Sequence, residues 1–533
     1  MAAGMFRSRW HNVAYRGQTY QIPFSSGGVN YSRNFEEIPS TGMVDPTKNI
    51  NLFEGGRAKR GGTSHVNDTA ISGVSTILGG YQFRLLSGTT FTMFLGDDGG
   101  LYKNTTTTIQ TGLSTTARPC FETLENELYF FDGQTRPQTW DGAAAGTSNI
   151  TTPAADWSGT DQPKYVLKHG LGASQRLWAM GVPGFEYRMY YSSNGDGKVF
   201  SGGTSGNIDI ETRDGFGLVG MFEFGERLFG VGKRKIYQIE DSDASTANWG
   251  YSAAQWEGGA AHHWLIAKTP NDVICMMEDG EIYSVGAVQS YGDYKAASVS
   301  RPSFIHNWIK DNASLSDIGK FHCIYDPVLR ACLFFVMRNG ASSIDTALVY
   351  FIDRAPQEAW SVHDNLVNPS GYGAFCSFLV RETAGNYKVY TGGYAGYMWS
   401  LNMASRSDND AAYACKFRGP PDPYGNARVQ KRYRRGWLVF SPAGAFSATV
   451  RWWVDQVAQT DISVSTVSTG GTYGSGVWGT AVYGQQEIAE TKFELGAIGK
   501  RLQIEIDNSN VDEDLFCSKI MIDHELIGPR AAA

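Results

Sequence analysis

The sequence has few cysteines and no long apolar run. Its seven cysteines are odd in number and widely spaced along 533 residues, several of them inside apolar segments such as LRACLFFVM, residues 329–337. This pattern favours reduced core thiols over a disulfide framework. No stretch approaches the roughly 20 apolar residues that span a bilayer, and the start, MAAGMFRSRWHNVAYRG, lacks the apolar block of a secretory signal. We therefore expect no membrane span and synthesis in the cytoplasm.

Charge of one sign and the common site motifs are also scarce. Charged residues make up 19% of the chain and the formal net charge is −7, which argues against a protein that coats nucleic acid, because such surfaces are basic. The sequence contains no CxxC, HExxH or EF-hand pattern and no GxSxG, so we expect no metal, no cofactor and no hydrolase triad. His262 and His263 are adjacent in a strand-like context, which sends their rings to opposite faces.

Glycine and aromatic residues are abundant, with 63 Gly, 27 Tyr, 28 Phe and 14 Trp. This composition predicts an all-β protein of many short strands. The length predicts two or three folding units, a large propeller counting as one.

A hairpin with an aromatic residue on its closing strand recurs from about residue 70. The equivalent aromatics are Tyr102, Trp140, Tyr190, Tyr237, Tyr283, Tyr350 and Trp399, at separations of 38, 50, 47, 46, 67 and 49 residues. Blades of about 40 to 50 residues are typical of a β-propeller, and six or seven blades fit. The longest interval holds an insertion, residues 298–319, with helix-like spacing at Ile305, Trp308 and Ile309.

The flanking segments differ from the repeats. The pattern divides the chain into an N-terminal extended arm ending in a hairpin that leads into the propeller (1–68), the β-propeller (69–402), a linker (403–430) and a C-terminal antiparallel β-sandwich (431–533). Within the sandwich, residues 466–484 are rich in Gly and Thr and predict an exposed loop.

The hairpin GGRAKRGGT, residues 55–63, places three cations among glycines and raises the question of a phosphate-binding loop. A P-loop needs Lys and Ser/Thr after its last glycine and a helix behind it. Here Gly62 and Thr63 follow Gly61, and the next residues indicate strand and turn. Two interpretations remain: a tight hairpin with solvated cations, or a surface on which Arg57, Lys59 and Arg60 meet DNA or an acidic neighbour.

A second basic cluster lies around the start of the sandwich, interleaved with aromatic residues. Its members are Lys416, Arg418, Arg428, Lys431, Arg432, Arg434 and Arg435. They are candidates for contact with DNA or with another subunit. The alternative is that they pair with the acidic run at Asp507, Asp512, Glu513 and Asp514.

Three segments carry a resemblance to a known family. They are KNINLFEGGRAKRGGTSHVN (48–67), KRYRRGWLVFSPAGAFSATVRWWVD (431–455) and IGKRLQIEIDNSNVDEDLFCSKIMIDHELIGPR (498–530). Together with the order of arm, propeller and sandwich, they resemble the tail hub or nozzle proteins of short-tailed bacteriophages, also called tail tubular protein B. The family more often has Pro-Gly where this chain has Gly61 and Gly62, and the blades are too diverged to match residue by residue.

This resemblance implies a structural role without enzymatic activity. It implies a homomeric ring, a hexamer in the family pattern, in the virion tail below the portal and adaptor rings. The genome would cross its channel in transient contact, and tail fibres or tailspikes would attach outside.

An enzyme or glycan-binding protein is the alternative function, because propellers also house glycosidases that use paired carboxylates across a central pocket. Acidic residues do lie near the turns, among them Asp97, Asp98, Asp132, Glu278 and Asp279. Asp is common in hairpin turns for its hydrogen bonds to the backbone, and no regular Asp-box repeat is present.

Overall fold

The computed structural model describes most of residues 18–527. The residues in that range that it does not describe are 33, 105–106, 171–173, 213–214, 256, 292–294, 296, 365, 367–372, 383–384, 441–446, 466–469, 472–481 and 484–488.

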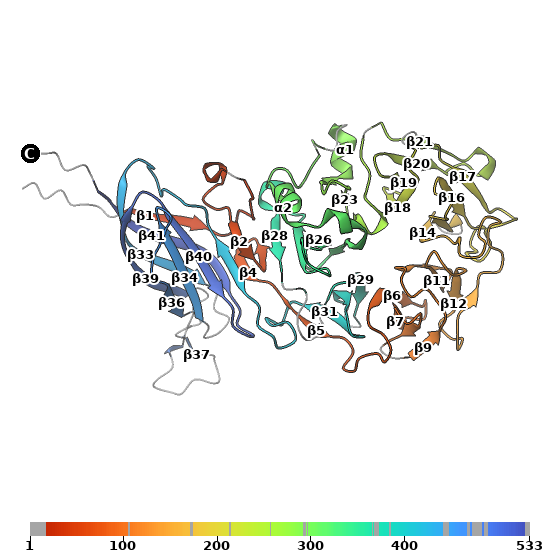
Figure 1. Ribbon diagram of the computed structural model, residues 1–533, viewed down its shortest axis with the longest axis horizontal. Helices are drawn as coiled ribbons and strands as arrows, with labels where there is room; N and C mark the ends of the chain where they lie inside the picture. Colours follow the sequence, from red (N-terminus) through yellow and green to blue (C-terminus); the bar gives the residue numbers. More distant parts are fainter. Residues whose placement is uncertain are drawn as a thin grey trace, which may run out of the picture.

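In the described part of the chain, seven antiparallel sheets form a β-propeller (Figure 1). The blades are β6 (Ile77–Arg84), β7 (Thr90–Gly96), β8 (Leu101–Lys103) and β9 (Thr107–Gln110); β10 (Cys120–Leu124), β11 (Glu127–Phe131), β12 (Gln138–Trp140) and β13 (Ser148–Asn149); β14 (Tyr165–His169), β15 (Arg176–Met180), β16 (Arg188–Tyr191) and β17 (Gly206–Asp209); β18 (Leu218–Phe224), β19 (Arg227–Gly232), β20 (Ile236–Glu240) and β21 (Gly250–Ala253); β22 (Ile266–Lys268), β23 (Val273–Met276) and β24 (Ile282–Ser284); β25 (His322–Asp326), β26 (Ala331–Val336), β27 (Thr346–Phe351) and β28 (Trp360–His363); and β29 (Cys376–Arg381), β30 (Tyr387–Gly392), β31 (Met398–Asn402) and β5 (Gly62–His65).

The ring closes between the first and last blades. The innermost strands β6, β10, β14, β18, β22, β25 and β29 contact one another in succession, and β29 returns to β6. The outermost strand of the last blade is β5, which comes from the N-terminal part of the chain and pairs with β31. Closure by a strand from the other end of the repeat array leaves no unpaired break in the ring.

The predicted repeat is confirmed. All seven equivalent aromatics lie on the third strand of a blade, and each is at most 6% exposed. Apolar side chains lie on both faces of these strands because each blade packs between two neighbours.

Two six-stranded sheets form the sandwich. One contains β1 (Gln18–Pro23), β3 (Ile50–Phe53), β4 (Gly56–Lys59), β41 (Phe516–Ile527), β33 (Gln430–Phe440) and β39 (Ala489–Gly499), and the other contains β2 (Val44–Lys48), β32 (Cys415–Arg418), β40 (Leu502–Asn508), β34 (Ser447–Val454), β35 (Val457–Ala458) and β36 (Ile462–Ser465).

The propeller is therefore an insertion within the sandwich. The N-terminal segment, predicted as an extended arm, supplies strands β1 to β4 to both sheets, and the chain returns to the sandwich at β32. The segment 403–430, predicted as a linker, contains β32, which pairs with β2 and β40. Local patterning could not reveal these strands, because their partners lie hundreds of residues away.

Helices are short. They are α1 (Val285–Tyr291), α2 (Ile305–Asn312) and the 3₁₀ turns η1 (Phe35–Glu37), η3 (Thr246–Asn248), η4 (His263–Leu265), η5 (Leu315–Lys320) and η6 (Pro356–Glu358). The predicted helix in the insertion is α2, which buries Ile305, Trp308 and Ile309. The predicted loop 466–484 lies outside the described residues except for β37 (Gly470–Gly471) and β38 (Val482–Tyr483), which pair with each other in parallel.

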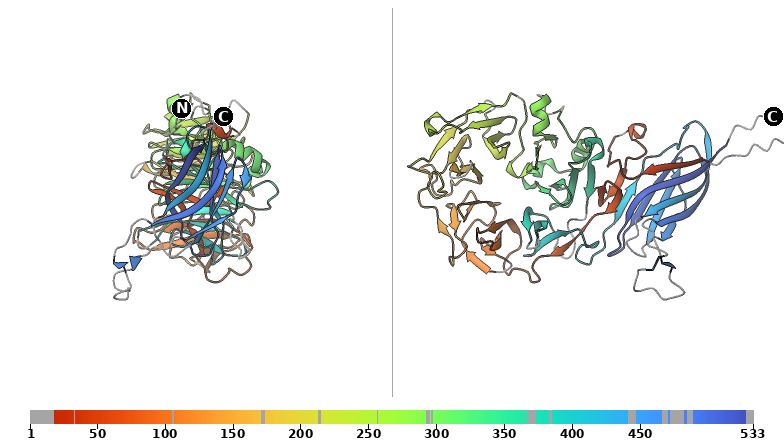
Figure 2. Two further views of the ribbon diagram at one scale, coloured as in Figure 1. Left: turned by 90° about the vertical axis from the view of Figure 1, so that its left-hand side faces the viewer. Right: turned by 180° about the vertical axis from the view of Figure 1, so that it is seen from behind.

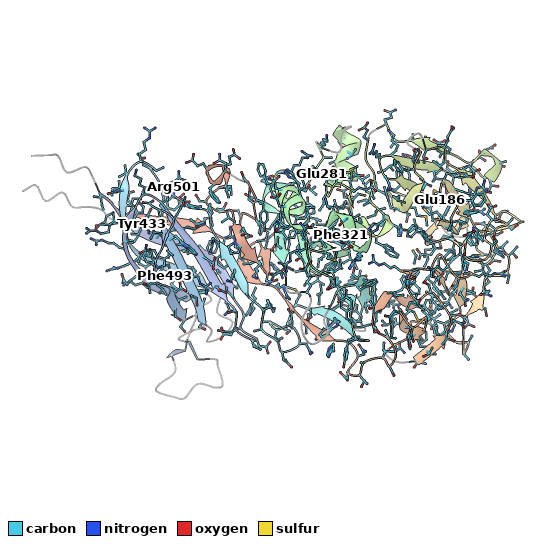
Figure 3. The ribbon with its side chains drawn as sticks, in the orientation of Figure 1. Glu186, Glu281, Phe321, Tyr433, Phe493 and Arg501 are labelled. Carbon is cyan, nitrogen blue, oxygen red and sulfur yellow. The ribbon has the colours of Figure 1, made fainter. Side chains whose placement is uncertain are left out.

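The sandwich lies beside the rim of the propeller, so the molecule is elongated (Figures 1 and 2). One core cluster runs through both domains and includes Phe321 on the propeller side and Tyr433 and Phe493 in the sandwich, which Figure 3 labels. Strand β28 of the sixth blade contacts β2 and β3. A shared apolar core couples the two domains as one body.

Candidate functional site: the junction of propeller and sandwich

Asn49 occupies the centre of the junction, between β2 and β3. It is fully buried and has a left-handed backbone with φ of 59°, a conformation that Asn tolerates better than most residues. Its backbone nitrogen donates to Val362 O (2.8 Å), and its backbone oxygen accepts from the Arg60 nitrogen (2.9 Å). The residue thereby bonds both to the sixth blade and to the segment that leads into the seventh.

The side chain of Asn49 extends the same network. Its Oδ1 accepts from Arg60 Nε and from the Asp364 nitrogen, both at 2.9 Å. Its Nδ2 donates to Asp364 Oδ1 (2.6 Å) and to Ala414 O (2.7 Å). One amide group therefore joins the chain leaving the sandwich, the sixth blade and the chain returning to the sandwich.

Arg60 and Asp408 clamp the two crossing segments together. The guanidinium donates to both carboxylate oxygens, at 2.9 Å from Nη1 to Oδ1 and 2.6 Å from Nη2 to Oδ2, and the side chains are 3% and 0% exposed. Tyr413 packs its ring 3.9 Å from the guanidinium carbon, and Thr63 Oγ1 donates to Asp408 Oδ1 at 3.2 Å. A two-armed pair of this kind has strict geometry, which makes it a register device for the crossing.

Lys59 lies one residue before the clamp and is 1% exposed. Its ammonium donates to Asn508 Oδ1 (3.0 Å) and to Asn510 O (2.8 Å), and it lies 4.7 Å from the centre of the Tyr413 ring. Burial is the main cause that lowers the pKa of Lys59. The side chain ties β4 to the turn after β40.

Arg57 points into the sandwich core and is 2% exposed. Its guanidinium lies over Phe24, 4.6 Å from the ring centre, and donates to the carbonyl oxygens of Ser26 (3.3 Å) and Thr41. Burial lowers the pKa of Arg57 to about 9, and the nearby Arg354 adds to the effect. Carbonyl groups and aromatic rings thus hold this cation.

The expectation that Arg57, Lys59 and Arg60 form a solvated or DNA-facing surface is wrong for this structure. All four residues of β4 are buried because the strand pairs on both edges, with β3 and with β41, and other segments cover both of its faces. The cations act inside the molecule, where they fasten the N-terminal strands.

Lys416 and Arg418 of the second cluster pair across the sandwich sheet. Lys416 meets Asp507, a member of the predicted acidic run, whereas Arg418 meets Glu505, which lies outside that run. They lie opposite Asp507 and Glu505 in the register of β32 and β40, at 3.5 Å for Lys416–Asp507 and 2.6 Å for Arg418–Glu505. Arg451 on β34 also reaches Glu505, at 3.0 Å. This outer face of the sheet therefore balances its own charge.

The other members of the second cluster differ in exposure. Lys431 is fully buried and donates to Asn426 O at 2.6 Å, so it is not available to a ligand. Arg434 and Arg435 are about half exposed and pair with Glu525 (2.6 Å) and Glu494 (3.5 Å). Arg428 and Arg432 are exposed, and their side chains have no ion-pair partner among the described residues. Of the ten candidate cations, these two are the freest to meet another molecule.

A buried histidine at the junction bonds to the backbone of β3. His363 is buried and lies 3.1 Å from Ile50 O through Nε2, and burial lowers its pKa to about 3. Among the described residues, no group of three or more His, Cys, Asp or Glu is placed to hold a metal. No helix in the described part of the chain is long and apolar enough to cross a membrane.

Sequence reasoning missed the partners of the three cations. Asn49 lies within the segment 48–67 that carries the resemblance, but that segment does not indicate its partners. Asp364 and Asp408 meet Asn49 and Arg60 across more than 300 residues. The run of three cations beside buried apolar strands was the available signal, because cations in a paired central strand require internal partners.

The sequence matches no family model and no curated protein. Among solved structures, the chain is similar to a chain in the crystal structure of BBS1N in complex with ARL6DN (10% identity, TM-score 0.41, covering 64% of this chain and 97% of that one). It is also similar to YCF48 from Cyanidioschyzon merolae (10%, 0.34, 64% and 99%) and to an exo-β-1,3-galactanase from Phanerochaete chrysosporium (10%, 0.25, 76% and 95%). Likenesses this distant carry no argument about function.

Proposed function

We propose that the protein is a structural subunit of a bacteriophage tail. It forms a homomeric ring, a nozzle or hub, that continues the DNA channel below the portal and adaptor and helps to hold fibres or spikes. The sequence resemblance at residues 48–67, 431–455 and 498–530 suggests this role. The observation that carries it is the insertion of the propeller into the sandwich, with Asn49, Arg60 and Asp408 locking both crossings.

Such a lock suits a wall subunit. If the two domains were joined by one flexible linker, they would move relative to each other, as weakly joined domains do by default. Here two chain crossings, a common apolar core and a buried ion pair oppose that motion. A ring built from rigid subunits of this kind keeps the shape of its channel while DNA moves through it under pressure.

Arg428 and Arg432 are the proposed contacts with a neighbouring subunit or with DNA in the channel, because both are exposed cations near the start of β33. Lys416, Arg418, Arg434 and Arg435 have acidic partners within the chain, so a further anion would compete for them.

Assembly of the purified full chain tests the proposal. We expect a ring, six-fold in the family pattern, by light scattering after size exclusion and by negative-stain microscopy, alone or with the adaptor protein. Polysaccharide turnover should be absent. A stable monomer that does not join the adaptor and that cleaves polysaccharide would contradict the proposal.

The paired variant Arg428→Ser/Arg432→Ser separates the two kinds of contact. Loss of the ring assigns these residues to a subunit interface, and a normal ring with impaired genome delivery assigns them to the channel. The control is Arg330→Ser, an exposed arginine on the propeller that pairs with Asp353. Normal assembly and normal delivery of the paired variant would remove both residues from the proposed contacts.

A further inference from the structure

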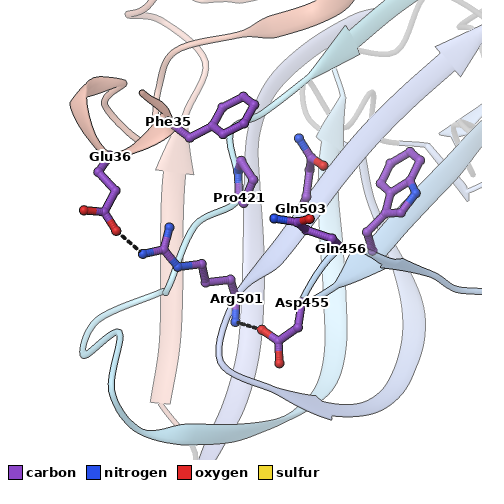
Figure 4. Close-up of a pocket in the computed structure, with 8 residues that line it drawn as sticks. Phe35, Glu36, Pro421, Asp455, Gln456, Arg501 and Gln503 are labelled. Carbon is purple, nitrogen blue, oxygen red and sulfur yellow. Dashed lines mark hydrogen bonds and ion pairs between the residues drawn. The ribbon is translucent and has the colours of Figure 1, made fainter. Parts of the chain in front are cut away.

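A pocket of about 270 Å³ opens on the sandwich, and no residue of the junction network lines it (Figure 4). Its wall comes from η1, from the turn at Pro421, from the β34–β35 hairpin and from the start of β40. The lining residues are Phe35, Glu36, Pro421, Trp453, Asp455, Gln456, Arg501 and Gln503.

The walls of the pocket are held in place by their own contacts. Arg501 forms an ion pair with Glu36, which fastens η1 to β40. The carboxylate of Asp455 accepts from the backbone nitrogens of Lys500 (3.0 Å) and Arg501 (2.9 Å), so the hairpin tip is fixed as well. Asn34 caps η1 by accepting from the Glu36 nitrogen at 3.1 Å. A site fixed before binding loses less conformational entropy when a ligand enters.

Several polar groups of the pocket have no partner within the described chain. The side-chain amide of Gln456 and the indole nitrogen of Trp453 form no hydrogen bond with the described residues. The Nε2 of Gln503 donates to Gly419 O (2.9 Å), and its Oε1 accepts no hydrogen bond from the described residues. The pocket therefore offers donors and acceptors at fixed positions.

Apolar rings lie beside these polar groups. Phe35 is 47% exposed, which is a large apolar surface on a turn that its own cap holds rigid. Pro421 lies next to it in the pocket (Figure 4). The guanidinium of Arg418 lies 4.2 Å from the centre of the Trp453 ring and fixes the indole.

The charged groups of the pocket are already satisfied. Arg501 is paired with Glu36, and Asp455 is bound by backbone nitrogens, so neither charge demands a counterion from a ligand. What remains is a combination of ring faces and neutral hydrogen-bonding groups. A pyranose ring matches it, because its axial C–H groups pack on apolar rings while its hydroxyls exchange hydrogen bonds with amides.

We infer that this pocket binds a neutral hexose unit of a polysaccharide. The volume accommodates about one sugar ring, since pockets for larger ligands begin near 300 Å³. The inference does not rest on ring assembly, because all the lining residues belong to one chain.

Saturation-transfer NMR on the full chain tests the inference, with the methyl α-glycosides of glucose, galactose, mannose and N-acetylglucosamine as probes. We expect transfer to at least one glycoside, with a Kd on the order of 1 mM. Phe35→Ala and Gln456→Ala should each weaken binding about tenfold, which corresponds to about 1.4 kcal/mol. Both side chains are exposed, so neither substitution removes core packing.

The matched control is Leu86→Ala, which removes another exposed apolar side chain, 90% accessible, on a propeller turn. It should leave the transfer unchanged. Absence of transfer to all four glycosides would overturn the inference, as would transfer that Phe35→Ala and Gln456→Ala leave intact. A change in oligomeric state caused by Phe35→Ala, without any glycoside binding, would instead assign the pocket to a subunit contact and would also overturn it.

Discussion

Arg60 and Asp408 form a buried two-armed ion pair between segments that are 348 residues apart in the chain. Arg60 leads from the sandwich into the propeller, and Asp408 leads back out. The pair thus joins the two ends of the inserted domain at the place where the seventh blade closes.

Replacing one residue of the Arg60–Asp408 pair should lower the free energy of unfolding more than replacing both. Arg60→Ala leaves the Asp408 carboxylate buried without its cation, and we expect a loss of about 3–5 kcal/mol in the free energy of unfolding. The double variant Arg60→Met/Asp408→Leu should recover part of this loss, because no buried charge is left unpaired. Urea unfolding measures both.

The control for this prediction is Arg330→Ala, since Arg330 and Asp353 form an ion pair in which both side chains are more than half exposed. We expect a loss of at most about 1 kcal/mol in its free energy of unfolding, because solvent screens an exposed pair. Equal losses in the free energy of unfolding for Arg60→Ala and Arg330→Ala would show that the buried ion pair stabilises the protein no more than an exposed one.

Two glycines of the hairpin should respond differently to alanine. A Cβ on Gly62 would lie 1.8 Å from the carbonyl oxygen of Ser407, whereas one on Gly55 would meet its nearest atom, in Phe516, at 3.5 Å. Gly62→Ala must displace backbone where β5 closes the ring, so we expect a loss of about 1–3 kcal/mol. Gly55→Ala should fold with nearly normal stability in thermal unfolding. A destabilised Gly55→Ala beside a normal Gly62→Ala would contradict the closure seen here.

The stability of the protein should fall in mild acid, in part because of His363. Burial lowers its pKa to about 3 in the folded state, against about 6.5 in the unfolded state. Between these values the unfolded state binds the extra proton, so this contribution is complete above pH 6.5 and is lost as the pH falls toward 3. The slope is at most about 1.4 kcal/mol per pH unit for one group.

Urea unfolding of the wild type and of His363→Gln at pH 7.5, 6.5 and 5.5 checks this sign. The variant should show the shallower dependence on pH, whatever its stability at pH 7.5. Parallel curves for the two proteins would show that His363 titrates alike in both states.

The cysteines should resist alkylation in the native protein. All seven are free, and only Cys323 is partly exposed. Burial raises the pKa of Cys120 to about 12 and that of Cys376 to about 11, so few thiolates form at pH 8. Mass spectrometry should find little iodoacetamide adduct on the folded chain and seven adducts in urea without reductant. Fewer adducts in urea would indicate a disulfide.

Much of the fold could be predicted because its evidence is local. A blade is a run of short paired strands, and the aromatic residue on each third strand recurs at the blade spacing, so Tyr102 and Trp399 marked equivalent positions before any pairing was known. The helix at Ile305–Asn312 followed from its own periodicity. The N-terminal strands could not be predicted in this way, because β1 pairs with β41 and β2 with β32 at the far end of the sequence.

The candidate site was predicted only in part. Charge pairing between Lys416 and Asp507 was among the alternatives, and the register of two neighbouring strands produces it. The burial of Arg57, Lys59 and Arg60 was not foreseen, since a polar pattern normally indicates an exposed strand. Their partners could be identified only from the structure, in which β4 pairs with a strand on each of its edges.

The sequence by itself determined the strand content and the recurrence of the blade hairpin, because each depends on neighbours close along the chain, but it left six or seven blades open until the strand pairing showed seven. Only the tertiary structure decided that the propeller is inserted into the sandwich and that the glycine-rich hairpin is an internal fastening. The physical reason is that a cation in water needs no partner, whereas a buried cation requires one. That partner, Asp408 for Arg60, is brought close only by the closed ring.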